Sequence, residues 1–129
     1  MLKLQAFTRV ALNNQSGQIL LIYNVKHSNF NFPGGKIEPG ESAEQCAIRE
    51  LYEEIGISTS TLRYIFDTNI IYDEKWIAHG YFYRSILDAE VITLKEPEKV
   101  SDSKWVNYDD LTTLQNLSPD VKTWIEHIK

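Results

Sequence analysis

Residues 42–56 have the sequence SAEQCAIRELYEEIG, and this stretch decides the fold more clearly than any other part of the chain. Ser42 suits the N-cap of a helix, and Gln45 three residues later completes a capping box. Gly56 suits the C-terminal stop of the same helix. Between these ends the apolar residues recur at helical spacing. They form one stripe, which consists of Ala47, Leu51 and Ile55. The stretch therefore predicts an amphipathic helix over residues 43–55.

Three acidic residues of this helix, Glu50, Glu53 and Glu54, are spaced so that they fall within about 100° of its surface, directly beside the apolar stripe. Arg49 lies to one side of that arc, so we expect no basic group within it. Like charges this close repel one another, and the hard cations Mg²⁺ or Mn²⁺ would remove the repulsion. Acidic helix faces are also common on solvated surfaces, so the three acids alone do not identify a site.

The segments around the helix favour strands and one further helix. Enrichment in aromatic and β-branched residues predicts strands over residues 5–12, 18–23, 62–71, 76–86 and 104–107. We expect a loop over 24–31, a turn over 72–75 and a helical turn over 109–111. Ser118 followed by Pro119 predicts the start of a final helix. Strands in antiparallel-looking pairs with helices between and after them predict an α+β fold, a mixed sheet sandwiched between helices, in one domain over residues 1–129.

The composition is that of a soluble globular protein, with 43% hydrophobic and 24% charged residues among 129. The net charge is −5 and no basic run occurs, so we expect no nucleic acid polymer as a partner. No apolar stretch approaches the length of a membrane span, and the N-terminus lacks the apolar centre of a signal peptide. Cys46 is the single cysteine, so an internal disulfide is excluded and a reducing, cytoplasmic location is expected.

The acids of the helix belong to a longer spaced pattern. Gly35 is followed by five residues and Glu41, then by seven residues and the run Arg49-Glu50-Leu51-Tyr52-Glu53-Glu54-Ile55-Gly56-Ile57. This pattern resembles the signature of the Nudix hydrolase family at every defined position. The resemblance covers residues 35–57, and the strands and final helix around them are similar to the family too. A phosphate-binding P-loop and a zinc-binding HExxH motif do not occur in the sequence.

The resemblance implies a metal-dependent hydrolase that cuts a diphosphate linkage. It places Mg²⁺ or Mn²⁺ on Glu50, Glu53 and Glu54, with the carbonyl of Gly35 alongside. It implies that Arg49 orients these acids and pairs with Glu41. The metal would stabilise charge on the phosphates and lower the pKa of an attacking water, and a carboxylate would take the proton of that water. Glu50 is the first choice for this base.

Further candidates lie outside the helix. The segment Glu96–Lys99 precedes the strand of Trp105, where many Nudix relatives carry another metal ligand or base, and we expect Glu98 to take that part ahead of Glu96. Lys36 follows the two glycines and could reach a phosphate. Phe32 and Tyr72 are aromatic residues that could stack on a base, although core packing is the ordinary role of each.

The segment Phe32–Glu38 resembles the MutT-like branch, which converts a nucleoside triphosphate to a monophosphate and pyrophosphate. Three alternatives stay open. Tyr72 lies at about the distance from the motif that is associated with hydrolases of dinucleoside polyphosphates, and a nucleotide sugar is another substrate class. A Nudix module that senses a nucleotide without cleaving it is the third. As partners we expect a small nucleotide and no membrane, and a homodimer stays open.

Overall fold

The computed structural model describes residues 4–87 and 91–128 of the chain. The strands are β1 (Leu4–Asn13), β2 (Gln18–Asn24), β3 (Asn29–Asn31), β4 (Gly34–Lys36), β5 (Arg63–Tyr72), β6 (Trp76–Ile86) and β7 (Val100–Asn107). The helices are α1 (Ala43–Ile55), α2 (Tyr108–Leu111) and α3 (Pro119–Ile128). No helix in this part of the chain is long and apolar enough to cross a membrane.

The strands form one mixed sheet with the order β3-β2-β1-β6-β5, in which β4 also pairs with β1 and β7 with β2. β1 and β6 are parallel along their length, and β5 and β6 form an antiparallel hairpin. β1 pairs with β2 at Asn13 opposite Ile19, whereas its segment from Phe7 to Arg9 pairs with β4. β1 and β2 therefore diverge, and the short β4 takes the place beside β1 that β2 leaves.

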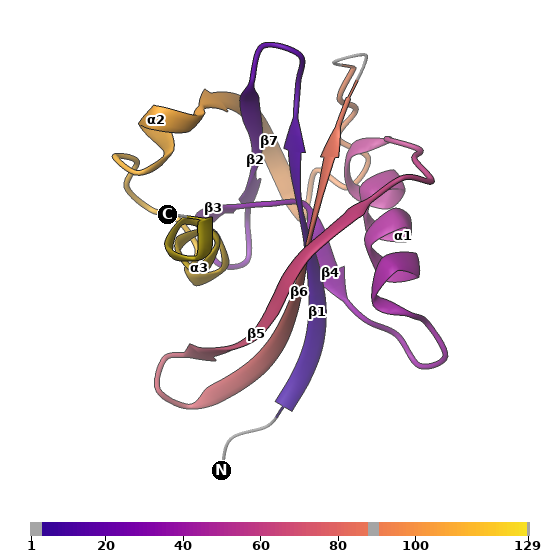
Figure 1. Cartoon of the computed structure of the whole chain (residues 1–129), viewed down its shortest axis with the longest axis vertical. Helices are drawn as coiled ribbons and strands as arrows, with labels where there is room; N and C mark the ends of the chain where they lie inside the picture. Colours follow the sequence, from indigo (N-terminus) through magenta and orange to yellow (C-terminus); the bar gives the residue numbers. More distant parts are fainter. Residues whose placement is uncertain (1–3, 88–90, 129) are drawn as a thin grey trace.

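Helices cover both faces of the sheet (Figure 1), with α1 on one side and α2 and α3 on the other. Alternation along β1 divides its side chains between two apolar clusters. Val10 and Leu12 pack in the cluster beneath α1, and Phe7 and Ala11 pack in the cluster beneath α3. Arg9, which lies between Val10 and Thr8 in the chain, belongs by this alternation to the α3 face.

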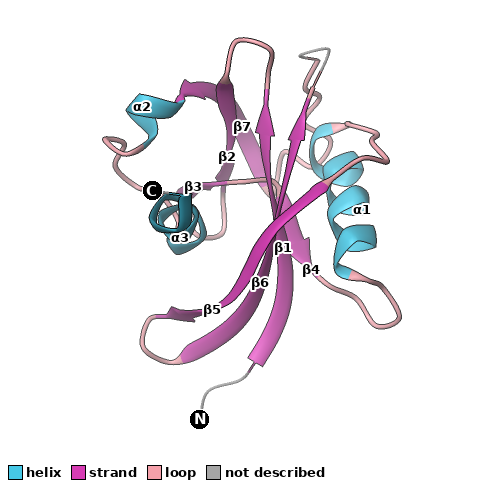
Figure 2. Cartoon of the chain, viewed as in Figure 1, coloured by secondary structure: helices cyan, strands magenta, loops and turns pink. Residues whose placement is uncertain are grey.

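The predicted central helix is confirmed in its details. α1 spans Ala43–Ile55, both hydrogen bonds of the capping box between Ser42 and Gln45 are present, and Gly56 ends the helix in the left-handed conformation. The predicted apolar stripe is buried. The final helix also begins where expected, and its Val121 and Trp124 are buried in the cluster beneath α3. The predicted α+β arrangement, a mixed sheet between helices (Figure 2), is confirmed.

Three short or polar strand segments differ from the expectations. The loop predicted over 24–31 is wrong at its two ends, because Asn24 continues β2 and β3 pairs with β2. β4 was not expected, and β7 begins at Val100 instead of residue 104. A strand of three residues is too short to show alternation, and pairing with a longer neighbour, not residue type, makes these segments extended.

Candidate active site

The acidic face of α1 lies against the two glycines of β4. The buried stripe of α1 fixes the rotation of the helix on the sheet, so the neighbouring face carries Glu50 and Glu54 toward Gly34 and Gly35. The predicted grouping of the three acids on one helix beside a buried stripe is confirmed, because Glu50 and Glu53 also share the same guanidinium nitrogen of Arg49. Helix and strand together bring acid side chains to backbone groups of a distant segment.

Glu50 packs directly on the backbone of Gly35. A Cβ atom at Gly35 would lie 2.6 Å from the Cδ of Glu50, so a glycine is required for this close approach. The Glu50 side chain is 15% exposed. Burial raises the pKa of Glu50 even though Arg49 acts in the opposite direction. The carboxylate is thus held in a partly desolvated position next to the Gly35 backbone.

Glu54 is bound to the backbone of the preceding glycine. The N–H of Gly34 donates to Oε1 of Glu54 at 2.9 Å. Burial raises the pKa of Glu54 to about 8, and the charges of Glu50 and Glu96 add to the rise, while Arg9 and the Gly34 N–H oppose it. Gly34 has a φ of +153°, and a side chain there would collide with the backbone of Thr8. A glycine is therefore needed at this first position of β4, from which the N–H reaches Glu54.

Arg49 connects the acids to the loop before α1. Its Nε and Nη2 donate to the two carboxylate oxygens of Glu41 at 2.7 and 3.0 Å. Its Nη1 donates to Glu50 at 2.8 Å and to Glu53 at 3.2 Å. The hydrogen bonds from Arg49 lower the pKa of Glu41 to about 2. Arg49 is placed on the helix beside the acidic arc, and its flexible side chain bends across one turn of helix to reach Glu53.

These acids are also the chain's principal candidates for a metal site. Within residues 4–87 and 91–128, no three His, Cys, Asp or Glu side chains are arranged so that they could hold a metal ion together. Glu50 and Glu53 are turned toward Arg49, and Glu54 toward Gly34. The donor set itself fits a hard divalent cation, since it offers carboxylate oxygens with a glycine backbone beside them. A cation would also offset the cost of charging the buried Glu50 and Glu54.

The loop that follows the undescribed residues 88–90 runs along the C-terminal end of α1. The N–H of Thr93 donates to the carbonyl of Ile55 at 3.0 Å, and that of Lys95 donates to the carbonyl of Glu54 at 3.2 Å. Glu96 is thereby close enough for its charge to act on Glu54. Glu98 is exposed, and in the described part of the chain no hydrogen bond or ion pair ties it to α1. The structure therefore brings Glu96 to the acids more closely than the expected Glu98.

The three residues expected to bind substrate occupy different surroundings. Lys36 is exposed at the end of β4, and its carbonyl accepts a hydrogen bond from Arg49. Tyr72 is half-buried, and its hydroxyl donates to Asp120. The ring of Phe32 has no exposed surface and packs edge-on against Trp124. The prediction that Phe32 stacks on a base is therefore wrong. Phe32 is a core residue, because a fully buried ring has no face free for a base.

Comparison with known proteins gives the family of the chain. The sequence model of the NUDIX domain matches residues 3–128. The chain belongs to the Nudix family. Nudix hydrolases act on pyrophosphate bonds of nucleotide-linked substrates and generally use divalent metals. The expected family is confirmed, and the match extends well beyond the 23-residue segment 35–57 on which the resemblance rested.

Individual Nudix relatives support the fold. The chain is 39% identical over 59 residues to the RNA pyrophosphohydrolase of Escherichia coli O139:H28, an alignment that covers 46% of this chain and 34% of that protein. The chain thus matches about a third of the length of the curated relatives. The MutT Nudix hydrolase of Burkholderia pseudomallei superposes with a TM-score of 0.86 at 22% identity, over 98% of this chain and 99% of that chain. The Nudix domain of Shewanella oneidensis NrtR, solved with ADP-ribose, superposes with a TM-score of 0.82 at 19% identity. That superposition covers 99% of this chain and 88% of that chain.

One group beside the Nudix acids was missed by the sequence analysis. Arg9 on β1 is 15% exposed and donates through Nε to the buried Asp120 of α3 at 2.8 Å. Asp120 also accepts from Asn31 at 3.1 Å and from Tyr72. Burial lowers the pKa of Arg9, but the negative charges of Asp120 and Glu54 raise it by more. The pKa of Arg9 is therefore raised overall. The available signal was a charged residue on the inward face of a strand between Phe7 and Ala11.

Proposed function

We propose that this chain hydrolyses a nucleoside triphosphate to a nucleoside monophosphate and pyrophosphate, using Mg²⁺ or Mn²⁺ held by the acids of α1. The observation that carries the proposal is the convergence of two carboxylates, Glu50 and Glu54, on the backbone of Gly34 and Gly35. The metal would be held by Glu50, Glu53, Glu54 and the carbonyl of Gly35, with Glu96 as the further acid. When bound, it would stabilise charge on the phosphates and lower the pKa of an attacking water.

The protein groups have separate parts in this proposal. Glu50 is the proposed general base, because it lies against the Gly35 backbone beside the other acids and burial raises its pKa. Arg49 acts as a positioning residue, since its bidentate contact with Glu41 anchors it while Nη1 holds Glu50 and Glu53. Lys36, exposed at the end of β4, is proposed to bind a phosphate oxygen.

The nucleoside triphosphate is preferred over a larger substrate because the net charge of −5, with no basic run, gives little attraction for a long polyanion. A second candidate, the 5′-triphosphate end of an RNA, is favoured by the 39% identity with RNA pyrophosphohydrolase over 59 residues. Both substrates present the same triphosphate to the acids and differ in what extends from the ribose. The single, buried Cys46 supports a reducing, cytoplasmic setting for either.

The proposal is tested by a substrate panel assayed with Mg²⁺ and with Mn²⁺. The panel contains the common nucleoside triphosphates, a dinucleoside polyphosphate, ADP-ribose and a 5′-triphosphorylated oligoribonucleotide. We expect the highest kcat/KM for a nucleoside triphosphate. A higher kcat/KM for the oligoribonucleotide would replace the nucleoside triphosphate with the second candidate, the 5′-triphosphate end of an RNA, as the proposed substrate. Nucleotide binding without turnover of any member at saturating metal would overturn the enzymatic proposal in favour of a sensing module.

A further inference from the structure

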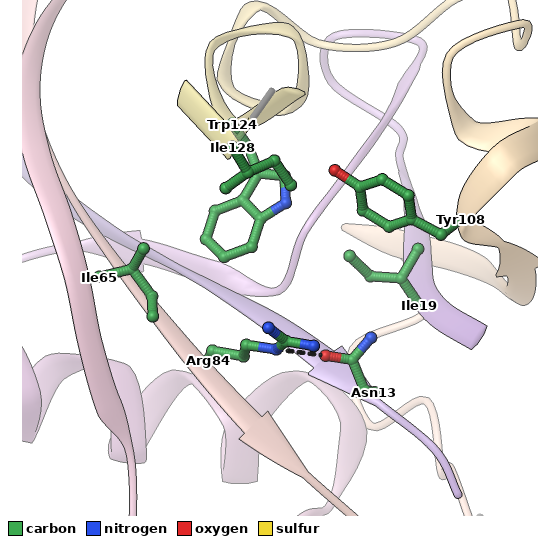
Figure 3. Close-up of a pocket in the computed structure, with 7 residues that line it drawn as sticks. All are labelled: Asn13, Ile19, Ile65, Arg84, Tyr108, Trp124 and Ile128. Carbon is green, nitrogen blue, oxygen red and sulfur yellow. Dashed lines mark hydrogen bonds between the residues drawn. The ribbon is translucent and has the colours of Figure 1, made fainter. Parts of the chain in front are cut away.

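A cavity lies away from the acids, on the face of the sheet opposite α1. It has a volume of about 320 Å³ and is bordered by α2, α3 and the ends of β1, β2, β5 and β6 (Figure 3). Its lining residues are Asn13, Ile19, Ile65, Arg84, Tyr108, Trp124 and Ile128. None of them belongs to the acidic motif. Asn13 is four residues beyond Arg9 along β1, a separation of roughly 13 Å.

One polar group of this cavity is a buried hydrogen-bond donor without a partner. The side chain of Trp124 is buried, and its Nε1 has no hydrogen-bond partner. Figure 3 shows this nitrogen on the side of the indole that faces Tyr108. A buried N–H that is left unpaired costs free energy, so a polar atom that is nine-tenths or more buried and turned into a cavity indicates a missing acceptor.

Arg84 adds positive charge to the same space. Its Nε donates to Oδ1 of Asn13 at 2.8 Å, which fixes the guanidinium at the floor of the cavity (Figure 3). This is the one hydrogen bond that Arg84 makes among the described residues, and the residue is exposed, so its two terminal nitrogens can donate to water or to a ligand. Burial raises the pKa of Tyr108 while the charge of Arg84 lowers it, which places the guanidinium within electrostatic reach of the Tyr108 hydroxyl.

The remaining walls are apolar. Ile19, Ile65 and Ile128 line the cavity together with the Trp124 ring, so an occupant must offer a flat or compact hydrocarbon surface as well as an acceptor. A volume of about 320 Å³ lies at the lower end of the range known for small-molecule sites, and fits a body of one or two rings. Among the residues that the structure describes, no carboxylate lines the cavity, and the one side-chain acceptor that a donor there already uses is Oδ1 of Asn13.

We propose that this cavity is a second ligand site, which binds a small aromatic or compact apolar anion. The oxygens of the anion accept from Arg84, Tyr108 and Trp124, and its apolar body packs among the isoleucines. The anionic group can be a carboxylate or a phosphate, since both accept from a guanidinium. The site is independent of the proposed hydrolase function, because it shares no residue with the acids of α1.

The test uses heteronuclear NMR of the ¹⁵N-labelled full chain, titrated with 1-naphthoate, 1-naphthyl phosphate and the neutral 1-naphthalenemethanol. The Nε1–H signal of Trp124 is expected to shift with either anion, because its hydrogen bond then forms. The signals of Trp76 and Trp105, which do not line the cavity, are expected to stay in place. The anion that binds more tightly identifies the head group. Binding of the alcohol as tight as that of both anions would overturn the proposal.

Two variants and a control test whether Arg84 and Tyr108 bind the anion. Arg84→Gln is expected to raise the Kd of the better anion by about tenfold or more, since a charged hydrogen bond is lost. Tyr108→Phe removes one hydroxyl and is expected to raise the Kd severalfold. Arg63→Gln removes the same charge from the strand position opposite Arg84, outside the cavity lining, and is expected to change the Kd less than threefold. An equal effect of Arg63→Gln and Arg84→Gln, or an unmoved Trp124 signal, would overturn the proposal.

Discussion

Glu53 and Glu54 are neighbours on α1 but have different surroundings. The side chain of Glu53 is 42% exposed and pairs with Arg49. Glu54 instead turns to the Gly34 N–H, and burial raises its pKa to about 8. Charging a buried carboxylate is costly unless a cation compensates it. In the proposed metal site, the two acids would therefore supply one exposed and one buried carboxylate.

We predict that Glu53→Gln and Glu54→Gln each lower kcat by at least ~10²-fold, because removing a ligand weakens the hold of the metal on charge that develops in the transition state. The amide keeps the size of the side chain, so circular dichroism and the melting temperature are expected to stay close to those of the unaltered protein. Glu44→Gln, in the exposed first turn of α1, is the control. A kcat close to normal in both variants at saturating metal would contradict the assigned roles.

Glu96 and Glu98 offer a matched pair in one loop. The charge of Glu96 raises the pKa of Glu54. Glu98 is exposed, and among the described residues it makes no hydrogen bond or ion pair with α1. We predict that Glu96→Gln lowers kcat/KM at limiting metal by about tenfold or more, in line with the loss of a group that supports a metal site. Glu98→Gln is expected to change it less than twofold. The opposite order in a titration of activity against Mg²⁺ would restore Glu98 as the candidate.

β4 acts on the site through its backbone. Gly35 leaves room for the Glu50 carboxylate, and Gly34 donates to Glu54, so three residues of strand determine where two acids of the helix lie. The motif predicted Gly35 as a site residue from its spacing. It did not predict that the two glycines form a strand, because the extended conformation there comes from pairing with Thr8 and Arg9 of β1.

Gly35→Ala tests this part of β4. The new Cβ would lie 2.6 Å from the Glu50 carboxyl carbon, so Glu50 must move away. Because a flexible side chain can move at little cost, we predict a loss of kcat of at least ~10-fold with a melting temperature lowered by only a few degrees. Gly17→Ala is the control, since a Cβ there meets no atom within 4 Å although its φ is +80°. The control is expected to lower stability without lowering kcat. Normal kinetics in Gly35→Ala would show that the position of Glu50 is not critical.

The helices and strands that could be predicted from the sequence are those with strong local signals. α1 has a capping box and a buried stripe, and β6 was predicted at its observed bounds, Trp76–Ile86, from its aromatic and β-branched residues. β3 and the first half of β7 carry polar residues such as Asn29, Ser101 and Asp102, and they become strands by pairing with β2. Pairing partners far away in the chain are not visible in a local pattern.

Arg9 and Asp120, which are separated by 111 positions in the sequence, join the first strand to the last helix. Asp120 is 2% exposed and also holds Asn31 and Tyr72. The acids of α1 could be predicted because they lie within one short motif. The group around Asp120 could not, because its members come from β1, β3, β5 and α3 and meet only once the sheet and α3 are packed.

We predict that Asp120→Ala lowers the free energy of unfolding by about 3–5 kcal/mol, because it leaves the charge of Arg9 buried without its partner. Urea unfolding followed by circular dichroism measures the change. Asp109→Ala, which removes an exposed carboxylate from α2, is expected to change it by less than about 0.5 kcal/mol. A loss below 1 kcal/mol for Asp120→Ala would mean that the Arg9 contact does not hold α3 on the sheet.

In the proposed reaction, a divalent metal held by the acids of α1 promotes release of pyrophosphate. The most direct measurement follows the products of a nucleoside triphosphate by ³¹P NMR in ¹⁸O-labelled water, with Mg²⁺ and then with excess chelator. We predict one pyrophosphate for each monophosphate, with the label in one of these two products, and no turnover after chelation. Orthophosphate as the first product, or activity that survives the chelator, would contradict both the reaction and the metal site.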